Sequence, residues 1–236
     1  MNLKNKIVVV TGAASGLGKE LAKGLAALKC DLILVDKIAK GSIVRVDLEQ
    51  PEEIASFSAQ VLEQKGYIDI LINCAGILIP ERLPKSTVED WHKVINTNLT
   101  APFLLVKYFA SAMNEKSEAP LVVNISSKSG EMGSPFCASY VASKHGLNGL
   151  TEAINEEYRI HGKLRAVSFC PGSIDTPAQK LLNGYPGIAP KPGIDSILNA
   201  TTTAQMIIDI IRYSDTIDVS DISFQARKNQ IYRKNK

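Results

Sequence analysis

The stretch Ile7-Val8-Val9-Val10-Thr11-Gly12-Ala13-Ala14-Ser15-Gly16-Leu17-Gly18 joins a short apolar run to a glycine-rich turn. Four consecutive apolar residues predict a strand buried on both faces of a sheet, and the amphipathic stretch that follows predicts a helix. Glycines at a junction from strand to helix let the backbone approach a pyrophosphate, which binds at the positive end of the helix. The spacing G-x-x-x-G-x-G differs from the commoner G-x-G-x-x-G, so a structural turn is the alternative interpretation. The expected contacts with a dinucleotide are Gly12, Ser15, Gly16, Leu17 and Gly18.

The same alternation of apolar runs and amphipathic stretches continues along the chain. Strands are expected at 7–10, 32–35, 43–46, 68–72, 121–125, 164–169 and, more weakly, 222–224. Helices are expected near 16–29, 51–65, 87–115, 138–161 and 200–213, the second opening with Pro51 and two glutamates. This order predicts a doubly wound α/β fold, in which about seven parallel strands carry helices on both faces.

One region interrupts the alternation. Residues 176–195 contain four prolines and three glycines, which predicts a long irregular loop. Its position after the sixth expected strand places it near the carboxyl edge of the sheet, where such folds bind ligands. The chain has 236 residues, 45% of them hydrophobic, and no linker, so we expect one domain over residues 1–236 with a substrate loop at about 176–195.

Composition narrows the class of protein. The net charge is only +3, and the one basic cluster is the tail at residues 227–236, which we interpret as solvated, with nucleic-acid binding as the alternative. Four dispersed cysteines form no C-x-x-C pair, which favours reduced thiols over a disulfide framework or a metal site. No apolar run is long enough to span a membrane. We therefore expect a cytoplasmic protein that binds neither nucleic acid nor membrane.

Two carboxylates follow expected strands. Asp36 lies eighteen residues after Gly18, at about the distance from which a carboxylate accepts hydrogen bonds from an adenosine ribose. A 2′-phosphate would bring negative charge against it, so the sequence favours NAD, although Lys37 and Lys19 could still support NADP. Asp47, with Leu48, is a candidate for the adenine edge, and Asp47 could equally belong to the N-cap region of the next helix.

A second pattern predicts proton transfer. Tyr140 and Lys144 are four residues apart, which on a helix places a phenol beside an ammonium. A free phenol has a pKa of about 10, and a cation at about 4 Å contributes roughly 4 kcal/mol, or about three pKa units. We therefore expect Lys144 to lower the pKa of Tyr140 towards neutrality, where acid–base catalysis is most efficient.

Several further motifs stand in a fixed order with these residues. They are Asn73-Cys74-Ala75-Gly76, Asn98 within Ile95-Asn96-Thr97-Asn98-Leu99, Ser127, and Pro171-Gly172-Ser173-Ile174-Asp175-Thr176. Together with residues 11–18 and 140–144, the ordered set resembles the short-chain dehydrogenase/reductase family over about residues 5 to 215. Any single motif is weak evidence, whereas the complete set at family spacing is specific. The departures are Cys74 at a position where the family usually has Asn, and a C-terminal end that lacks the family's Gly-rich segment.

The resemblance implies a Rossmann-fold oxidoreductase that exchanges a hydride between a nicotinamide cofactor and an alcohol or carbonyl substrate. It implies that Tyr140 is the acid–base, that Ser127 bonds the substrate oxygen, and that Lys144 holds the nicotinamide ribose. Asn98 would anchor a water that relays protons. Ser126 and Asn96 are the competing assignments, and a non-catalytic dinucleotide sensor or scaffold is the competing function.

The resemblance also implies further contacts and a quaternary state. Cofactor contacts are expected at Asn73, Ala75, Gly76, Pro171, Gly172, Ile174 and Thr176, in addition to Tyr140 and Lys144. The substrate is expected near Lys128, Glu131, Met132, Cys137 and Ser173. The helices near 98–115 and 138–161 resemble those that pair subunits, which implies a homodimer or homotetramer.

Overall fold

Seven strands form one parallel sheet in the computed structural model, which describes residues 1–186, 197–214 and 221–225 without the side chain of His161. The strands are β1 (Ile7–Thr11), β2 (Asp31–Asp36), β3 (Val44–Arg45), β4 (Ile70–Asn73), β5 (Leu121–Ile125), β6 (Arg165–Pro171) and β7 (Asp221–Phe224). Their order is β3-β2-β1-β4-β5-β6-β7, so the winding reverses between β1 and β4. The predicted Rossmann-type doubly wound fold is confirmed.

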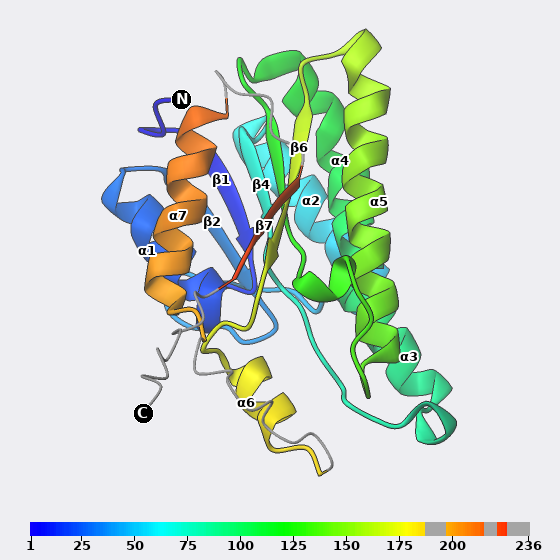
Figure 1. The fold of residues 1–236 in the computed structure, drawn as a ribbon. Helices are drawn as coiled ribbons and strands as arrows, with labels where there is room; N and C mark the ends of the chain where they lie inside the picture. Colours follow the sequence, from blue (N-terminus) through cyan, green and yellow to red (C-terminus); the bar gives the residue numbers. More distant parts are fainter. Residues whose placement is uncertain (187–196, 215–220, 226–236) are drawn as a thin grey trace, which may run out of the picture.

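Helices cover both faces of this sheet. They are α1 (Gly16–Ala27), α2 (Pro51–Lys65), α3 (Val88–Ile95), α4 (Ala101–Lys116), α5 (Ala138–His161), α6 (Pro177–Asn183) and α7 (Ala200–Tyr213), with short turns η1 (Leu83–Lys85), η2 (Asn96–Thr100) and η3 (Lys128–Gly130). Figure 1 shows α1 and α7 on one face, α2, α4 and α5 on the other, and α6 beyond the carboxyl ends of the strands.

The core consists of two layers because side chains alternate along each buried strand. Val9, Leu71 and Val122 point to the layer under α2, α4 and α5. Val8 and Ile70 belong to the layer under α1 and α7. All residues of β4 and β5 are buried, and both strands are apolar except for Asn73 and Asn124.

Two expected elements differ in the structure. The helix expected at 87–115 is divided into α3 and α4 by the π-helical turn η2. Part of the expected irregular loop is the helix α6, whose N-terminus is capped by the Thr176 hydroxyl and opens with Pro177. The prolines and glycines misled the prediction because Pro is well tolerated at the first helical position. Residues 187–195 of the loop and the tail at 227–236 lie outside the described residues.

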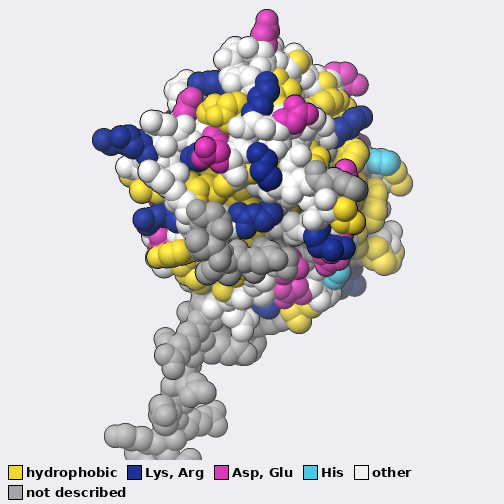
Figure 2. All heavy atoms as spheres, turned by 90° about the horizontal axis from the view of Figure 1, so that it is seen from above, with side chains coloured by type: hydrophobic (Ala, Val, Ile, Leu, Met, Phe, Trp, Pro, Cys, Tyr) yellow, Lys and Arg dark blue, Asp and Glu magenta, His cyan; other side chains and the backbone are white. Residues whose placement is uncertain are grey.

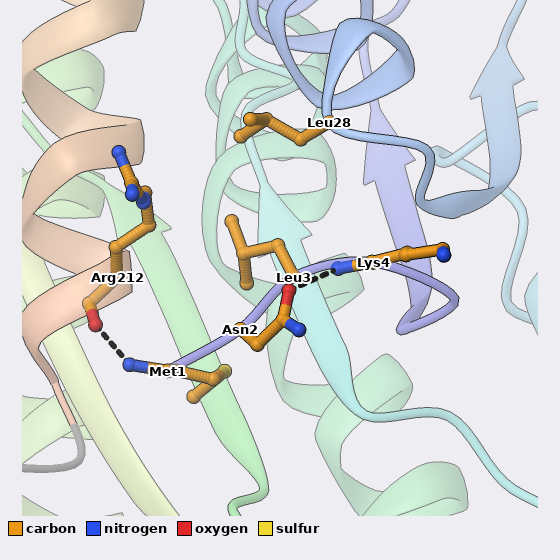
Figure 3. Close-up of a pocket in the computed structure, with 6 residues that line it drawn as sticks. All are labelled: Met1, Asn2, Leu3, Lys4, Leu28 and Arg212. Atoms are coloured by element: carbon orange, nitrogen blue, oxygen red, sulfur yellow. Dashed lines mark hydrogen bonds between the residues drawn. The ribbon is translucent and has the colours of Figure 1, made fainter.

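The edge of the sheet where the strands begin is distinct from the edge where they end. A hollow at the beginning of β1 is lined by Met1, Asn2, Leu3, Lys4, Leu28 and Arg212, and the N-terminal ammonium donates to the Arg212 carbonyl (Figure 3). Seen from above, acidic and basic side chains are interspersed on this side (Figure 2). None of the expected site residues lines this hollow, so the site is built at the opposite edge.

Candidate active site

Close packing at the carboxyl end of β1 explains the glycines of the turn. Gly12 has φ of +71°, and a Cβ there would lie 2.8 Å from the Cα of Ala75. A Cβ at Gly18 would overlap the Gly12 carbonyl oxygen. Gly16 has φ of +52° and faces the Thr176 side chain, so the turn lies directly beside the start of α6. Only glycine satisfies the positive φ values without strain.

The N-terminus of α1 has the properties of an anion site. Ser15 is its N-cap residue, yet no side chain caps the helix and no acidic residue lies in the first turn. By contrast, α3 is capped by Thr87 and α7 by Asn199. The free N–H groups and the positive end of the helix dipole together fit a pyrophosphate. Leu17 is buried in the core and anchors this turn.

Asp36 ends β2 beside the glycine turn. Its Oδ2 accepts the Ala14 N–H at 3.0 Å and its Oδ1 accepts the Ile38 N–H at 3.2 Å, so the carboxylate is held against the turn. Lys37 is bound by Asp47 at 3.1 Å and by Glu49 at 3.2 Å. Asp47 and Glu49 therefore pair with Lys37, the cation that could otherwise have bound a 2′-phosphate.

Asp47 is used locally. Besides the ion pair with Lys37, its Oδ1 accepts the Glu49 N–H at 3.1 Å. The N-cap residue of α2 is Gln50, and its N–H donates to the Asp47 carbonyl at 3.0 Å. The alternative that Asp47 belongs to the N-cap region of α2 therefore fits the structure. Leu48 is buried in the core, and only its backbone is placed to contact an adenine.

The segment after β4 is tied to β1. Thr11 Oγ1 accepts the N–H groups of Cys74 and Ala75, both at 3.1 Å. Asn73 is buried, and its Nδ2 donates to Asn124 Oδ1 at 2.8 Å, so its side chain stabilises the sheet and only its backbone can reach a cofactor. Gly76 faces the other expected residues, since a Cβ there would lie 3.5 Å from Asn98 Oδ1 and 3.6 Å from Lys144 Nζ.

The first turns of α5 bring Tyr140 and Lys144 together. The Lys144 Nζ lies 5.6 Å from the centre of the Tyr140 ring and donates to the Ile125 carbonyl at 2.7 Å. Lys144 is 4% exposed, and this burial lowers its pKa to about 8 because desolvation disfavours the ammonium. The amine therefore lies close to the phenol ring and is hydrogen-bonded to the last residue of β5.

The expected effect of Lys144 on the Tyr140 pKa is wrong for this structure. Burial raises the pKa of Tyr140 above its ordinary value, and a hydrogen bond with Ser127 opposes that rise only in part. The Lys144 ammonium donates to the Ile125 carbonyl, and its charge does not offset the desolvation of the phenol. The sequence argument counted the helical spacing but not the desolvation of both groups.

Two serines follow β5, and the structure separates them. Ser127 interacts with the Tyr140 hydroxyl, and its Oγ accepts the Ser129 N–H at 3.1 Å. Ser126 is buried and its Oγ donates to the Lys144 carbonyl at 3.3 Å. Ser127 is thus placed beside the phenol, whereas Ser126 holds the backbone of α5.

Asn98 lies in the π-helical turn, fully buried. Its Oδ1 accepts the Ile77 N–H at 2.8 Å, and its Nδ2 donates to the Ile77 carbonyl at 2.9 Å and to Ser143 Oγ at 3.1 Å. Asn96 bonds only Thr100 within its own turn. π-Helical turns free backbone groups and are common at functional sites. Asn98 is therefore the asparagine that faces the site.

Sequence reasoning missed Ser143, although it stands next to Lys144. Its hydroxyl donates to the Tyr140 carbonyl at 2.7 Å and so connects Asn98 to the turn that carries the phenol. A serine within the Tyr-x-x-x-Lys step was the available signal. The Ile125 carbonyl that receives Lys144 left no signal, because any residue supplies a carbonyl.

The segment after β6 packs differently from a plain turn. Pro171 still pairs with Phe224 of β7, and the Gly172 N–H donates to the Phe224 carbonyl at 2.7 Å. Ile174 bridges to Leu198. The Thr176 hydroxyl accepts the Gln179 N–H at 3.4 Å as the cap of α6, and its methyl group contacts Gly16. These residues border the glycine turn from the side of α6.

A hollow beside the start of α5 is lined by Arg82, Leu83, Pro84 and Phe136. Sequence reasoning named none of these. Of the residues it did name, Met132 is largely exposed and Cys137 is buried as the N-cap of α5. Lys128 and Glu131 pair with each other at 2.8 Å. Within the described residues, no cluster of Asp, Glu, His and Cys side chains could hold a metal ion.

Fold and site together define a dinucleotide-binding α/β protein, and comparison with known proteins narrows this class. A family model described as short chain dehydrogenase matches residues 6–184. The D-beta-hydroxybutyrate dehydrogenase of Rhizobium meliloti is 33% identical over 189 residues, which cover 73% of this chain and 72% of the relative.

Two solved structures agree. Ligand-free aldohexose dehydrogenase of Thermoplasma acidophilum has a TM-score of 0.83 at 26% identity, covering 94% of this chain and 92% of that one. A 4-hydroxyisoleucine dehydrogenase complexed with NADH has a TM-score of 0.79 at 31% identity, covering 93% and 96%.

The chain therefore belongs to the short chain dehydrogenase family. It is an oxidoreductase that transfers a hydride between a nicotinamide cofactor and an alcohol or carbonyl group. The family and the enzyme class predicted from the ordered motifs are confirmed. Among the helices of the described residues, none is long and apolar enough to cross a bilayer.

Proposed function

We propose that Tyr140 is the general acid–base of this oxidoreductase and that Ser127, Lys144 and Asn98 complete its site. The observation that carries the proposal is convergence: the Lys144 amine lies 5.6 Å from the Tyr140 ring, Ser127 bonds the phenol, and Asn98 and Lys144 both face Gly76. These residues come from separate elements at the carboxyl edge of the sheet, where doubly wound folds bind ligands.

The raised pKa of Tyr140 defines its protonation state. At neutral pH the phenol carries its proton, so it can donate that proton to a carbonyl oxygen as the substrate is reduced. Ser127 stabilises the same oxygen as negative charge develops on it. In the oxidative direction the phenol must first lose its proton, and the phenolate then accepts the proton of the alcohol.

Lys144 and Asn98 would support the phenol by holding the cofactor and by relaying protons. Lys144 holds one donor on the Ile125 carbonyl and presents its remaining donors towards Gly76, where a nicotinamide ribose fits. Both N–H donors of the Asn98 amide are used by Ile77 and Ser143, whereas among the described residues its Oδ1 accepts only the Ile77 N–H. A relay water would therefore donate to the second acceptor position of this oxygen, and proton exchange with solvent would pass through that water.

The nicotinamide, when bound, accepts or returns the hydride. NAD is the favoured form, because Asp36 lies beside the glycine turn and Asp47 and Glu49 hold Lys37. A 2′-phosphate at this position would face the Asp36 carboxylate, while Lys37 is already paired with Asp47 and Glu49. NADP is the alternative, with Lys19 as the remaining cation of the turn.

The whole chain would act as one catalytic domain whose substrate is a small alcohol or carbonyl compound. Self-association into a homodimer or homotetramer through α4 and α5 is part of the proposal, supported by the exposed side chains of Phe103 on α4 and Ile160 on α5. Free cysteines support a reducing, cytoplasmic location. Analytical ultracentrifugation measures the assembly.

Replacing Tyr140 by Phe tests the mechanism. The variant should lose about 10²- to 10⁴-fold in kcat for carbonyl reduction, because the ring remains and only the proton donor is lost. Thermal stabilisation by NADH should be unchanged. Tyr158→Phe, on the same helix but packed against the core, is the matched control and should retain activity. Equal turnover by parent and Tyr140→Phe would overturn the mechanism, and no turnover by the parent would favour a non-catalytic sensor.

A further inference from the structure

The hollow lined by Arg82, Leu83, Pro84 and Phe136 adjoins the catalytic residues along two chain segments. Phe136 immediately precedes the N-cap of α5, so its Cα is within about 14 Å of the Cα of Tyr140. The other segment runs from Gly76, beside Lys144, to Arg82. The Glu81 N–H donates to the Phe136 carbonyl at 2.8 Å and joins the two segments.

Arg82 carries a positive charge without a carboxylate partner among the described residues. Its guanidinium lies 5.9 Å from the centre of the Phe136 ring, where a cation is stabilised by the ring face. It forms no ion pair within the described part of the chain. A guanidinium fixed on an aromatic platform keeps its fork of N–H groups free for a ligand.

The nearest acid is turned to other partners. Glu81 Oε1 accepts the Tyr185 hydroxyl at 2.6 Å and the Arg82 backbone N–H at 2.7 Å. These two hydrogen bonds are the main causes that lower the Glu81 pKa, and the Arg82 charge is the smallest of them, below that of Lys85. The carboxylate of Glu81 is thus held by Tyr185 rather than neutralising the guanidinium.

The platform beneath Arg82 is itself held in place. Phe136 has φ of +62°, a left-handed conformation that is unfavourable for a bulky residue. Its ring packs against Tyr185 at 5.5 Å between centroids. Tyr185 therefore contacts both the ring and Glu81, and it fixes the geometry of the hollow from the end of α6.

We infer that Arg82 binds a carboxylate of the substrate, so that the substrate class is the oxo acids and their hydroxy acid counterparts. The inference rests on the proposed function, since Tyr140 must act on the carbonyl while Arg82 holds the other end. A single guanidinium matches a single negative charge, and its planar fork matches a carboxylate. Leu83 and Pro84, both exposed, provide apolar surface for the chain between the two groups.

Matched substrate pairs test this inference. Straight-chain 3-, 4- and 5-oxo acids are compared with their methyl esters, which keep the carbonyl and remove the charge. The parent enzyme should prefer an acid over its ester by about 10- to 100-fold in kcat/KM, the range for a hydrogen bond to a charged group. Arg82→Met should abolish the preference, mainly through a higher KM for the acid, whereas kcat/KM for the ester should change by a much smaller factor.

Two variants sharpen the result. Arg82→Lys should restore only part of the preference, because an ammonium lacks the bidentate fork. Lys85→Met, which removes an exposed cation three residues away, should retain the full preference. Equal loss with Lys85→Met would show a general field rather than a binding contact and would overturn the inference.

Failure of the inference about Arg82 can be distinguished from failure of the proposed mechanism. A parent enzyme that reduces esters as well as acids, or only neutral ketones, contradicts the assignment of Arg82 and leaves the proposed mechanism standing. Full activity of Tyr140→Phe contradicts the mechanism whatever Arg82 does. Turnover of neither acids nor neutral ketones counts against both.

Discussion

The cofactor side and the substrate side of this site are built by different means. Around the glycine turn the backbone defines the geometry, because Gly12 lies against Ala75 and Gly18 lies against the Gly12 carbonyl. The hollow near α5 is instead lined by side chains, and in the segment that leads to Phe136 a Cβ on Gly133 would meet nothing within 4 Å. One side tolerates almost no change of residue, whereas the other can change its side chains without disturbing the fold.

The difference follows from the ligand that each side serves. Every member of a nicotinamide-dependent family must bind the same dinucleotide, and close backbone approach requires glycine at fixed spacing. Substrates vary, and loops at the carboxyl edge can vary with them. The sequence motifs therefore lie on the cofactor side, and the residues that recognise the substrate have no motif.

The largest expected effect comes from adding one methyl group to a glycine on each side of the site. Gly18→Ala should destabilise the protein by about 3 kcal/mol and abolish NADH binding, because its Cβ overlaps backbone that cannot move. Gly133→Ala should change stability by less than about 0.5 kcal/mol. Chemical denaturation and NADH titration measure both. Comparable losses in the two variants would remove the distinction between the sides.

The next effect concerns the phenol between the two sides. Since burial raises the pKa of Tyr140 above that of an ordinary phenol, the phenol stays protonated through neutral pH. Alcohol oxidation, which needs the phenolate, should rise about tenfold per pH unit between about pH 7 and 9, whereas carbonyl reduction should not depend on this group there. Tyrosinate absorbance of the ligand-free protein, compared with Tyr140→Phe, reports the titration directly. If Tyr140 ionised near neutral pH, this result would support the original expectation that Lys144 lowers the pKa of Tyr140.

A smaller effect tests the charge beside the glycine turn. Asp36→Asn keeps an acceptor for the Ala14 N–H but removes the negative charge, so the preference for NAD over NADP should fall about tenfold, or 1.4 kcal/mol. Thermal stabilisation by each cofactor at equal concentration measures the preference. Asp31→Asn, at the other end of β2, is the control and should leave it unchanged. A parent that NADP stabilises more than NAD would contradict the role of Asp36.

The smallest effect lies at the hollow. Tyr185→Phe keeps the ring against Phe136 but releases Glu81, which can then turn towards Arg82. Stability should change by less than about 1 kcal/mol, because the hydrogen bond is only partly buried. KM for an oxo acid should rise about threefold and KM for its ester should stay the same. A rise for both substrates would mean that Tyr185 shapes the hollow rather than orienting Glu81.

Much of the fold could be predicted, and the reasons are local. Unbroken runs such as 7–10 predicted buried strands, and the order of runs predicted the parallel sheet. The break between α3 and α4 could not be predicted, because the π-helical turn depends on Asn98 reaching Ile77 and Ser143 across the fold. Helix α6 was missed because the prolines and glycines of residues 176–195 suggested only a loop.

The sequence by itself determined which groups we propose for the chemistry of this protein: the glycine turn, Asp36, and the ordered Asn98, Ser127, Tyr140 and Lys144. Periodicity and spacing carry that information because they depend on neighbours along the chain. Only the tertiary structure decided that Lys144 bonds the end of β5 and leaves the phenol protonated, and that Phe136 lies beneath Arg82. Desolvation and contacts between distant loops depend on what the folded chain places around a residue, which local spacing does not encode.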